Sequence, residues 1–309
     1  MQAQAMVYIV DPDEAVSGAL SSLLATYRID VIAYADAESF LQAVRDGSIV
    51  DDGCLLLDLD LPGDSGLSLL QQLQSAERQL PVIALSKHAD EGLRRQCMQA
   101  GATDLVYKPF VAAYLFTRLS DLVPCLDSLR GSAASTMALP DGTQVTFRMM
   151  HPEDAEIEQA FVTGLSEKSK YMRFFSPLKA LSADMLWEFT HHSFPISYAL
   201  IATIPLAGKE VQVGVARYAM TNTDGIAEFA VVVADEWHGF GIASQLMRGV
   251  TTAAAVGGIR SLEGVVLRDN LPMLTLMRNT GFTVLPDPED GPSVVRVVKE
   301  LRDNAKVVS

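Results

Sequence analysis

Short apolar runs alternate with amphipathic segments along roughly the first 110 residues of the chain. Runs of strand length lie near residues 6–10, 30–33, 53–57, 81–85 and 104–107. Between them, apolar positions recur at helical spacing, for example over residues 14–27 and 91–100. Alternation of this kind with short connections predicts an α/β domain in which helices cover both faces of a doubly wound parallel sheet.

The pattern changes after Pro124, where the small and polar run from Gly131 to Ser135 has no periodicity and predicts a linker. We expect a first domain over 1–123, a linker over 124–142 and a second domain over 143–302. The second pattern is α+β. It predicts strands at 145–149, 196–204, 211–220, 226–233, 261–267 and 293–300, and helices opening at Pro152, from Gly241 to Ala255, and over 270–279.

Four polar side chains follow strands of the first domain. Asp11 follows the first strand, Asp58 ends the third, Ser86 follows the fourth, and Lys108 follows the fifth. Because the carboxyl ends of parallel strands share one edge of a sheet, these side chains are expected to form a site there.

Together with Pro62-Gly63, these residues resemble the receiver domain of two-component response regulators, a flavodoxin-like fold. The resemblance implies that Asp58 accepts a phosphoryl group from a sensor histidine kinase, that Ser86 and Lys108 hold it, and that carboxylates bind Mg²⁺. The second acid of the family's pair is replaced by Pro12. The sequence therefore offers Asp11, Asp58 and Asp13 as metal ligands. The alternative is a receiver-shaped module that accepts no phosphate.

A second motif runs from Ala227 to Ala243, where a strand leads through a glycine-rich turn into a helix. Backbone N–H groups in such a turn, with the helix dipole, favour an anion. With Asn270 and Gly281-Phe282 downstream, the motif resembles the GNAT acetyltransferase superfamily, which binds acetyl-CoA here. The resemblance assigns coenzyme contacts to Val231, Val233, His238, Gly239, Phe240, Gly241, Ile242, Ala243 and Asn270.

The segment from Glu167 to Phe175 resembles the "Ser-x-x-Ser-x-Tyr-x-Arg-Phe-Phe" segment of bacterial protein lysine acetyltransferases. This subgroup implies that Glu228 is the catalytic base and that the acceptor is a lysine of a protein. Without the family match, Glu228 reads as a solvated strand acid. Two alternatives remain for the whole chain: an acetyltransferase for a small amine, and a signalling adaptor that binds acyl-CoA without turnover.

Charge and composition restrict the partners. The net charge is −14; residues 1–130 hold 18 acidic and 9 basic residues, and the remainder holds 20 and 15. Neither half has the basic balance of a nucleic-acid binder. No apolar run reaches the length of a membrane span, and the three cysteines have no metal-ligand spacing. We therefore expect a cytoplasmic protein with no nucleic-acid or membrane partner.

Overall fold

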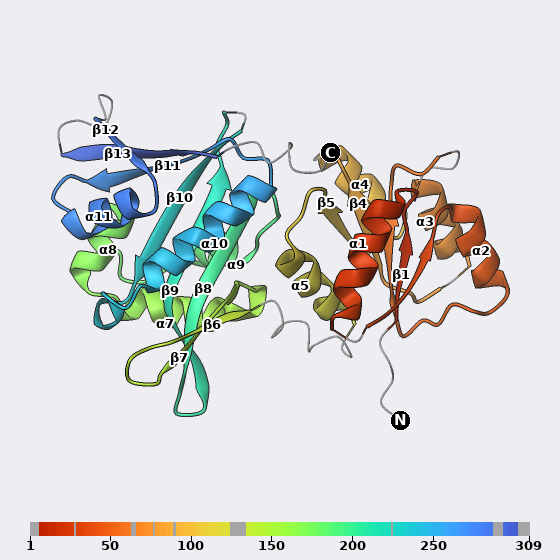
Figure 1. Cartoon of the computed structure of the whole chain (residues 1–309), viewed down its shortest axis with the longest axis horizontal. Helices are drawn as coiled ribbons and strands as arrows, with labels where there is room; N and C mark the ends of the chain where they lie inside the picture. Colours follow the sequence, from red (N-terminus) through yellow and green to blue (C-terminus); the bar gives the residue numbers. More distant parts are fainter. Residues whose placement is uncertain are drawn as a thin grey trace. The chain divides into compact units, whose positions relative to one another are not determined.

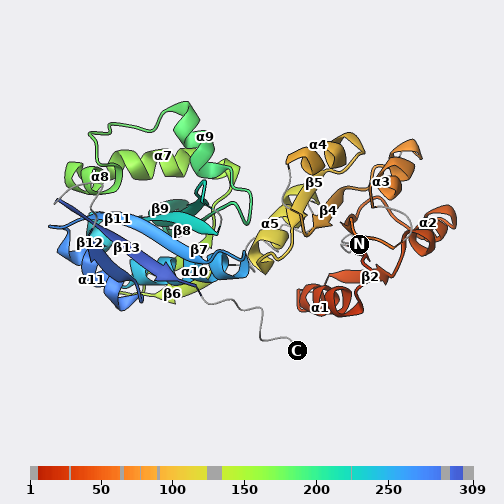
Figure 2. The same ribbon diagram turned by 90° about the horizontal axis from the view of Figure 1, so that it is seen from above.

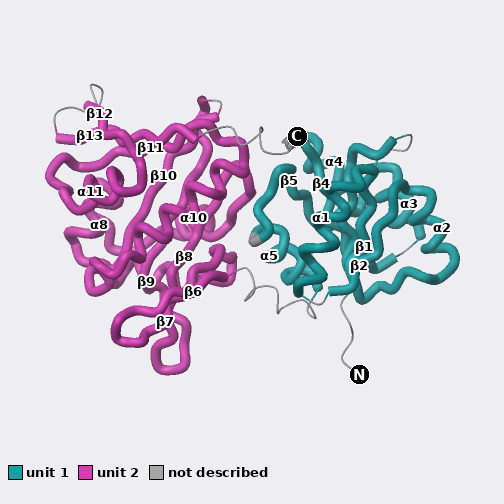
Figure 3. Tube along the Cα trace, in the orientation of Figure 1, with its two compact units in different colours: residues 1–133 teal, residues 134–309 magenta. Residues whose placement is uncertain are grey.

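The computed structural model describes residues 6–27, 29–62, 66–76, 78–88, 91–123, 134–223, 225–286 and 293–301. The chain forms two compact units, residues 1–133 and 134–309 (Figure 3). Each unit is described by itself. Residues 124–133 of the predicted linker and residue 302 lie outside the described residues.

The first unit contains a five-stranded sheet in the order β2-β1-β3-β4-β5, and every neighbouring pair is parallel. This order confirms the flavodoxin-like fold. The elements of this unit (Figure 1) are β1 (Met6–Val10), α1 (Glu14–Ala25), β2 (Asp30–Tyr34), α2 (Ala37–Arg45), β3 (Cys54–Asp58), α3 (Gly66–Ser75), β4 (Val82–Ser86), α4 (Glu91–Gln99), β5 (Asp104–Tyr107) and α5 (Ala112–Leu122).

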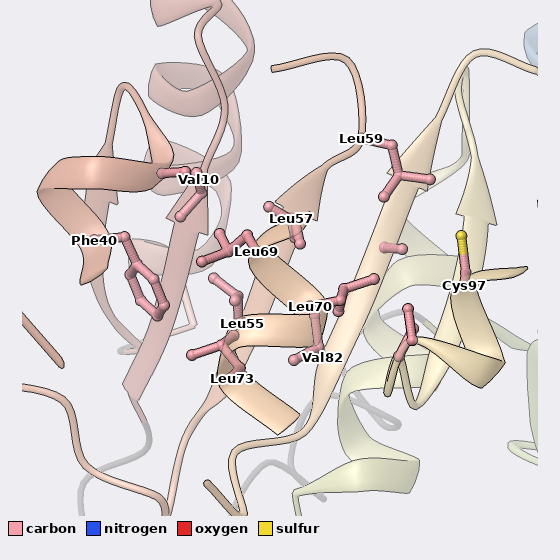
Figure 4. Close-up of a cluster of buried hydrophobic side chains, with 14 of the residues drawn as sticks. Val10, Phe40, Leu55, Leu57, Leu59, Leu69, Leu70, Leu73, Val82 and Cys97 are labelled. Atoms are coloured by element: carbon pink, nitrogen blue, oxygen red, sulfur yellow. The ribbon is translucent and has the colours of Figure 1, made fainter. Parts of the chain in front are cut away.

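The central strands β3 and β4 are buried at every position because helices cover both faces of the sheet. One face packs Leu55 and Leu57 of β3 against Phe40 of α2 and Leu69 of α3 (Figure 4). The helices α1 and α5 complete the unit. Leu24 of α1 and several side chains of α5 are buried. A core on both sides fixes the strands in register, so the residues at their carboxyl ends are held in place.

The second unit contains an eight-stranded sheet in the order β12-β13-β11-β10-β9-β8-β7-β6. Only β10 and β11 are parallel neighbours. The elements are β6 (Ser135–Ala138), β7 (Gln144–Met149), a 3₁₀ turn η2 (Pro152–Asp154), α7 (Ala155–Gly164), α8 (Glu167–Phe174), α9 (Ala183–Thr190), β8 (Ser197–Leu206), β9 (Lys209–Met220), β10 (Ile226–Val233), a 3₁₀ turn η3 (Asp235–Trp237), α10 (Ile242–Val256), β11 (Ser261–Leu267), α11 (Leu271–Asn279), β12 (Thr283–Pro286) and β13 (Val294–Glu300).

The linker predicted over 124–142 extends too far, because Ser135–Ala138 form strand β6, which pairs with β7. The segment is short, and three of its four residues are exposed, so it shows no apolar alternation that marks a strand. Its pairing depends on the turn that follows, where Gly142 has a φ of +89° and Leu139 is buried. The hairpin is therefore fixed by the turn and by its neighbour in the sheet.

Helices lie on both sides of this sheet. Figure 2 shows α7, α8 and α9 on one side, with α10 and α11 on the other. On the first side, Phe161 and Val162 of α7 pack in one cluster with Val215 of β9 and Val232 of β10. On the other side, α10 buries Leu246, among others. The end of β10, between these two layers, leads through η3 into the glycine-rich turn.

Candidate functional site

Three of the predicted receiver residues meet at the carboxyl edge of the first sheet. The Lys108 Nζ atom lies 2.7 Å from Asp11 Oδ2 and 2.9 Å from Asp58 Oδ2. Both carboxylates are buried. Their other oxygens accept backbone N–H groups, from Asp13 to Asp11 Oδ1 at 2.9 Å and from Asp60 to Asp58 Oδ1 at 3.1 Å. The site is therefore a lysine shared by two oriented carboxylates.

Ser86 lies beside this group, because β4 and β5 pair Ser86 with Tyr107, the residue before Lys108. The Lys108 backbone N–H donates to the Ser86 carbonyl at 2.6 Å. Burial acts to lower the pKa of Lys108, but hydrogen bonds and charge attraction from Asp11 and Asp58 outweigh it and raise that pKa. Lys108 is therefore a fixed cation between the two acids.

Asp13 does not join this site. It is the N-cap of α1, and its Oδ1 atom accepts the N–H groups of Ala15 and Val16 at 2.9 and 3.3 Å. Among the described residues, no three His, Cys, Asp or Glu side chains gather closely enough to hold a metal ion. We therefore assign Asp13 to the helix cap, because an exposed acid just before a helix satisfies N–H groups that otherwise lack partners.

The two remaining acids still fit Mg²⁺. This ion is commonly bound by one or two carboxylates, with waters and phosphate oxygens completing its shell. Asp11 and Asp58 are both buried, and both approach the same Lys108 atom. A two-carboxylate site is thus consistent with the geometry, whereas the three-carboxylate set predicted from the sequence is not.

The second site opens where β10 and β11 part. The two strands pair only from Ile226 to Glu228 on β10, against Ser261 to Glu263 on β11. Beyond Glu228, β10 continues for five residues beside β9 alone. Val231, Val232 and Val233 of this stretch line a cavity of about 570 Å³. A strand edge left open in this way presents backbone groups to a ligand.

The glycine-rich turn lines this cavity, which we call the β10 pocket. Gly239 and Gly241 both have a φ of +83°, and a Cβ added at either would meet no atom within 4 Å. Gly241 is the N-cap of α10, a helix of 15 residues. The turn therefore has the left-handed conformation that favours glycine, open space beside it, and a helix N-terminus suited to an anion.

The β10 pocket contains most of the residues predicted to bind a coenzyme. It is lined by Val231, Val233, His238, Gly239, Gly241, Ile242, Ala243 and Asn270. Phe240 does not line it, and its side chain is 43% exposed. The coenzyme contact of Phe240 therefore stays a prediction, whereas the glycines on either side of it line the pocket.

Two of the residues predicted to contact the coenzyme also form side-chain hydrogen bonds within the protein. The His238 Nε2 atom lies 2.8 Å from the Val233 carbonyl, so its N–H donates to the end of β10. The Asn270 Oδ1 atom accepts the Met273 N–H at 3.2 Å and caps α11. His238 thus joins the turn to the end of β10, while the amide nitrogen of Asn270 remains the donor that this side chain offers to a ligand.

Glu228 stands at the point where the strands separate, as the last residue of β10 that pairs with β11. It is exposed and does not line the β10 pocket itself. Arg173 lies near both Glu228 and the β10 pocket. Its side chain lines the pocket, and its pKa is lowered to about 10 by burial and by the charge of Arg217, against opposing effects of Glu158 and Glu228.

Comparison with known proteins identifies the second unit. The family model described as acetyltransferase (GNAT) domain matches residues 144–283. Acetyltransferase PA5475 of Pseudomonas aeruginosa is 32% identical over 158 residues, which cover 51% of this chain and 85% of that protein. The chain belongs to the GNAT acetyltransferases. It is an N-acetyltransferase, and the β10 pocket lies in its GNAT domain.

The first unit is matched separately. The response regulator receiver domain model matches residues 7–120. The transcriptional regulatory protein FixJ of Bradyrhizobium diazoefficiens is 26% identical over 168 residues, covering 54% of this chain and 78% of FixJ. The response regulator TodT of Pseudomonas putida is 38% identical over 105 residues, but these cover only 45% of TodT. A receiver domain therefore precedes the GNAT domain.

Solved structures resemble each part. The GNAT domain of S. lividans PAT is 32% identical, and the match covers 55% of this chain and 98% of that chain at a TM-score of 0.49. The FixJ-N structure is 31% identical, and the match covers 41% of this chain and 96% of that chain at a TM-score of 0.35.

Sequence patterns gave no role to the residues that hold α8 against the GNAT pocket. Asp235 accepts the hydroxyl groups of Ser166 at 3.1 Å and Ser169 at 2.9 Å. Burial acts to raise the pKa of Asp235, but these hydrogen bonds outweigh it and lower that pKa. Asp235 begins η3, just before the glycine-rich turn, so one ionised carboxylate joins the wall formed by α8 to that turn.

Among the described residues, none of the helices combines the length and apolar character needed to cross a bilayer.

Proposed function

We propose that this chain is a protein lysine acetyltransferase whose activity is controlled by phosphorylation of its receiver domain. One observation carries the catalytic part of the proposal: Glu228 stands where β10 and β11 separate, beside a pocket whose glycine turn suits a pyrophosphate. A general base and a coenzyme site are thus neighbours on one strand.

Acetyl-CoA fits the pocket by the chemistry of its walls. The backbone N–H groups around Gly239 to Gly241 and the N-terminus of α10 suit the pyrophosphate. The open edge over Val231 to Val233 suits the amide-rich pantetheine arm, which adds to β10 as a further strand does. Asn270 offers its amide N–H₂ to the same arm.

Glu228 supplies the proton transfer that the amine requires. A lysine ammonium has a reference pKa of about 10.4, so at neutral pH it must lose a proton before it attacks. Glu228 accepts that proton directly or through water, and the amine nitrogen forms a bond to the thioester carbonyl carbon. Backbone N–H groups at Val231 to Val233 stabilise the oxyanion. The C–S bond then breaks, the nitrogen gives its second proton to solvent, and the thiolate takes a proton from solvent.

The acceptor is proposed to be a protein lysine because of the segment from Glu167 to Phe175. This segment forms α8 and its C-cap, and Ser169, Met172 and Arg173 line the GNAT pocket. Two residues that match the motif, Ser169 and Arg173, therefore lie at the proposed coenzyme site rather than in a remote part of the domain.

At the receiver site, Asp58 is the proposed phosphoacceptor and a sensor histidine kinase the partner. A carboxylate oxygen of Asp58 forms the new bond to phosphorus as the P–N bond to the imidazole of the kinase phosphohistidine breaks. Lys108 and Ser86 hold the transferred oxygens. Asp11 and Asp58 would hold Mg²⁺, which would supply positive charge between the two anions. Phosphoryl transfer from a sensor kinase and the use of acetyl-CoA both favour a cytoplasmic location.

Acetyl-lysine profiling of a cell extract tests the acceptor. The purified full chain and acetyl-CoA should add acetyl groups to protein lysines, and the Glu228→Gln chain should not. Turnover on polyamines or amino acids with no protein acetylation would favour a small-amine enzyme. Coenzyme binding with no turnover on either class would favour the adaptor.

Phosphorylation of the full chain tests whether the receiver domain controls acetylation. The full chain is compared before and after treatment with acetyl phosphate, alongside an equally treated Asp58→Asn chain. We expect acetylation of the same protein substrate to change by roughly 5- to 150-fold in the wild type only, the range of typical allosteric coupling. Equal rates in all samples would contradict receiver control and leave the acetyltransferase activity intact.

A further inference from the structure

The phosphates of coenzyme A need cations, and the glycine-rich turn provides few. Its two residues other than glycine are His238 and Phe240. The His238 Nε2 atom is hydrogen-bonded to the Val233 carbonyl, 2.8 Å away, and the Phe240 side chain carries no charge. The turn therefore offers a phosphate its backbone N–H groups and a helix dipole. The Nε2 atom of its histidine is already hydrogen-bonded within the protein.

Two cationic side chains other than His238 occur among the described residues that line the pocket: Lys168 and Arg173, both on α8. Arg173 is half-buried, with its Cζ atom 5.0 Å from the centre of the Phe174 ring. It is also close enough to Glu228 for that charge to act on its pKa. Arg173 therefore belongs to the end of the pocket where the acyl group reacts.

Lys168 belongs to the opposite end. It lies in the first turn of α8 and is exposed. Its neighbour Ser169 donates to Asp235 at 2.9 Å, and Ser166, the N-cap of α8, donates to the same carboxylate at 3.1 Å. Asp235 begins η3, which leads into the glycine-rich turn. These bonds hold the first turn of α8 beside the phosphate-binding turn.

An acid on the pocket wall adds negative charge beside the phosphate-binding turn. Asp235 lines the pocket just before this turn, and it keeps its charge because hydrogen bonds outweigh burial and lower its pKa. Since like charges at short range oppose binding, a mobile ammonium group on the facing wall favours the approach of a phosphate.

We propose that Lys168 binds a phosphate group of coenzyme A from α8, across the pocket from the glycine-rich turn, and takes the place of a cation within that turn. The inference rests on the coenzyme site proposed above. The hydrogen bonds from Ser166 and Ser169 to Asp235 are what place this lysine. The phosphate is either the pyrophosphate or the 3′-phosphate, and the two have the same chemistry toward an ammonium group.

Calorimetry with the full chain and no acceptor tests this inference. We expect Lys168→Met to weaken the binding of coenzyme A about tenfold, the scale of one hydrogen bond between charged groups. Lys168→Arg should bind within about threefold of the wild type, because it keeps the charge. Lys179→Met, which removes an exposed lysine outside the pocket lining, is the matched control and should bind as the wild type does.

Smaller probes separate the two phosphates. If Lys168 binds the 3′-phosphate, the difference between wild type and Lys168→Met disappears with 3′-dephospho-coenzyme A. If it binds the pyrophosphate, the difference remains with that probe and disappears with pantetheine. Either result supports the proposal. Unchanged coenzyme A affinity in Lys168→Met, or an equal loss with pantetheine, overturns it. A wild-type chain that binds no coenzyme A would instead overturn the coenzyme site.

Discussion

Arg217 of β9 and Glu158 of α7 form an ion pair inside the GNAT domain, with Arg217 Nη2 2.5 Å from Glu158 Oε1. The Glu158 side chain is 1% exposed, and its second oxygen accepts the Gln212 amide at 2.5 Å. The Arg217 Cζ atom also lies 3.9 Å from the centre of the Phe189 ring of α9. One guanidinium thus joins α7, α9 and the sheet on the face that carries Glu228.

Removing one partner of this ion pair should lower the stability of the GNAT domain. We expect Glu158→Gln to lower the free energy of unfolding of the GNAT domain by roughly 3–5 kcal/mol, because Arg217 remains buried without its counter-ion. Urea denaturation of the full chain measures this by fluorescence, since both tryptophans, Trp187 and Trp237, lie in the second unit.

The control for this variant is Glu188→Gln. Glu188 is an exposed residue of α9, so its loss should change stability by no more than about 0.5 kcal/mol. Equal stability of Glu158→Gln and Glu188→Gln would contradict a structural role for the buried pair.

The Glu228→Gln chain should bind coenzyme A as the wild type does and lose turnover. A lost general base typically costs about 10²–10⁴-fold in rate, and the glutamine keeps the size of the side chain. Calorimetry measures binding, and thiol release from acetyl-CoA measures turnover. Glu300→Gln, an exposed acid at the end of β13, is the control. Wild-type turnover in Glu228→Gln would remove Glu228 from its proposed role.

Gly241→Asn should weaken coenzyme binding by about tenfold or more, a loss of at least about 1.4 kcal/mol. Asparagine tolerates the left-handed conformation that Gly241 has, so the main effect is a side chain that fills the open space beside the turn. Gly208→Asn is matched to it. Gly208 has a φ of +76°, has no atoms near its Cβ position, and lies in the β8–β9 hairpin. If both variants bind coenzyme A equally well, the turn does not hold it.

Acetyl phosphate with Mg²⁺ should add one phosphoryl group to the full chain, detected by intact mass. Asp58→Asn should gain none, because the nucleophilic carboxylate is lost, and removal of Mg²⁺ by EDTA should prevent the gain in the wild type. Asp60→Asn, an exposed acid two residues along the chain, should be modified normally. A phosphoryl group that persists on Asp58→Asn would locate the acceptor elsewhere.

His192 should make the GNAT domain sensitive to acid. Burial and the charge of Arg217 lower the pKa of His192 from 6.5 to about 3. A group with a depressed pKa stabilises the fold above its unfolded pKa, and this stability is lost as pH falls from about 6.5 toward 3. Each pH unit in that interval removes up to about 1.4 kcal/mol.

Urea denaturation followed by tryptophan fluorescence between pH 7 and 4 measures this effect. The loss of stability on acidification should be smaller in His192→Leu than in the wild type, because the leucine takes up no proton in the unfolded chain. His191→Leu is the control, since His191 is exposed and stacks on Trp187. Parallel pH profiles for the wild type and His192→Leu would contradict the buried, neutral imidazole.

The sequence alone determined the elements whose residues carry a strong local signal. Five apolar runs predicted the receiver strands, and the acids and lysine that follow them predicted which side chains share an edge, because parallel strands leave no other arrangement. The turn from His238 to Gly241 was likewise visible. A glycine-rich turn can be purely structural, and the downstream Asn270 and Gly281-Phe282 were what indicated a coenzyme site. The resemblance to both families rested on these signals, whereas the order of strands in the second sheet came from the structure.

The tertiary structure decided what each of these side chains is free to do. Asp13 looked like a metal ligand, but the unpaired N–H groups at the start of α1 bind its carboxylate. His238 and Phe240 were both predicted to contact the coenzyme. In the structure, the His238 side chain donates a hydrogen bond to the Val233 carbonyl, and Phe240 is exposed. Strand β6 and the bond from Ser169 to Asp235 join segments with no shared periodicity. Hydrogen bonds between distant segments leave no trace in local patterns, because any polar residue can form them once the chain has brought a partner near.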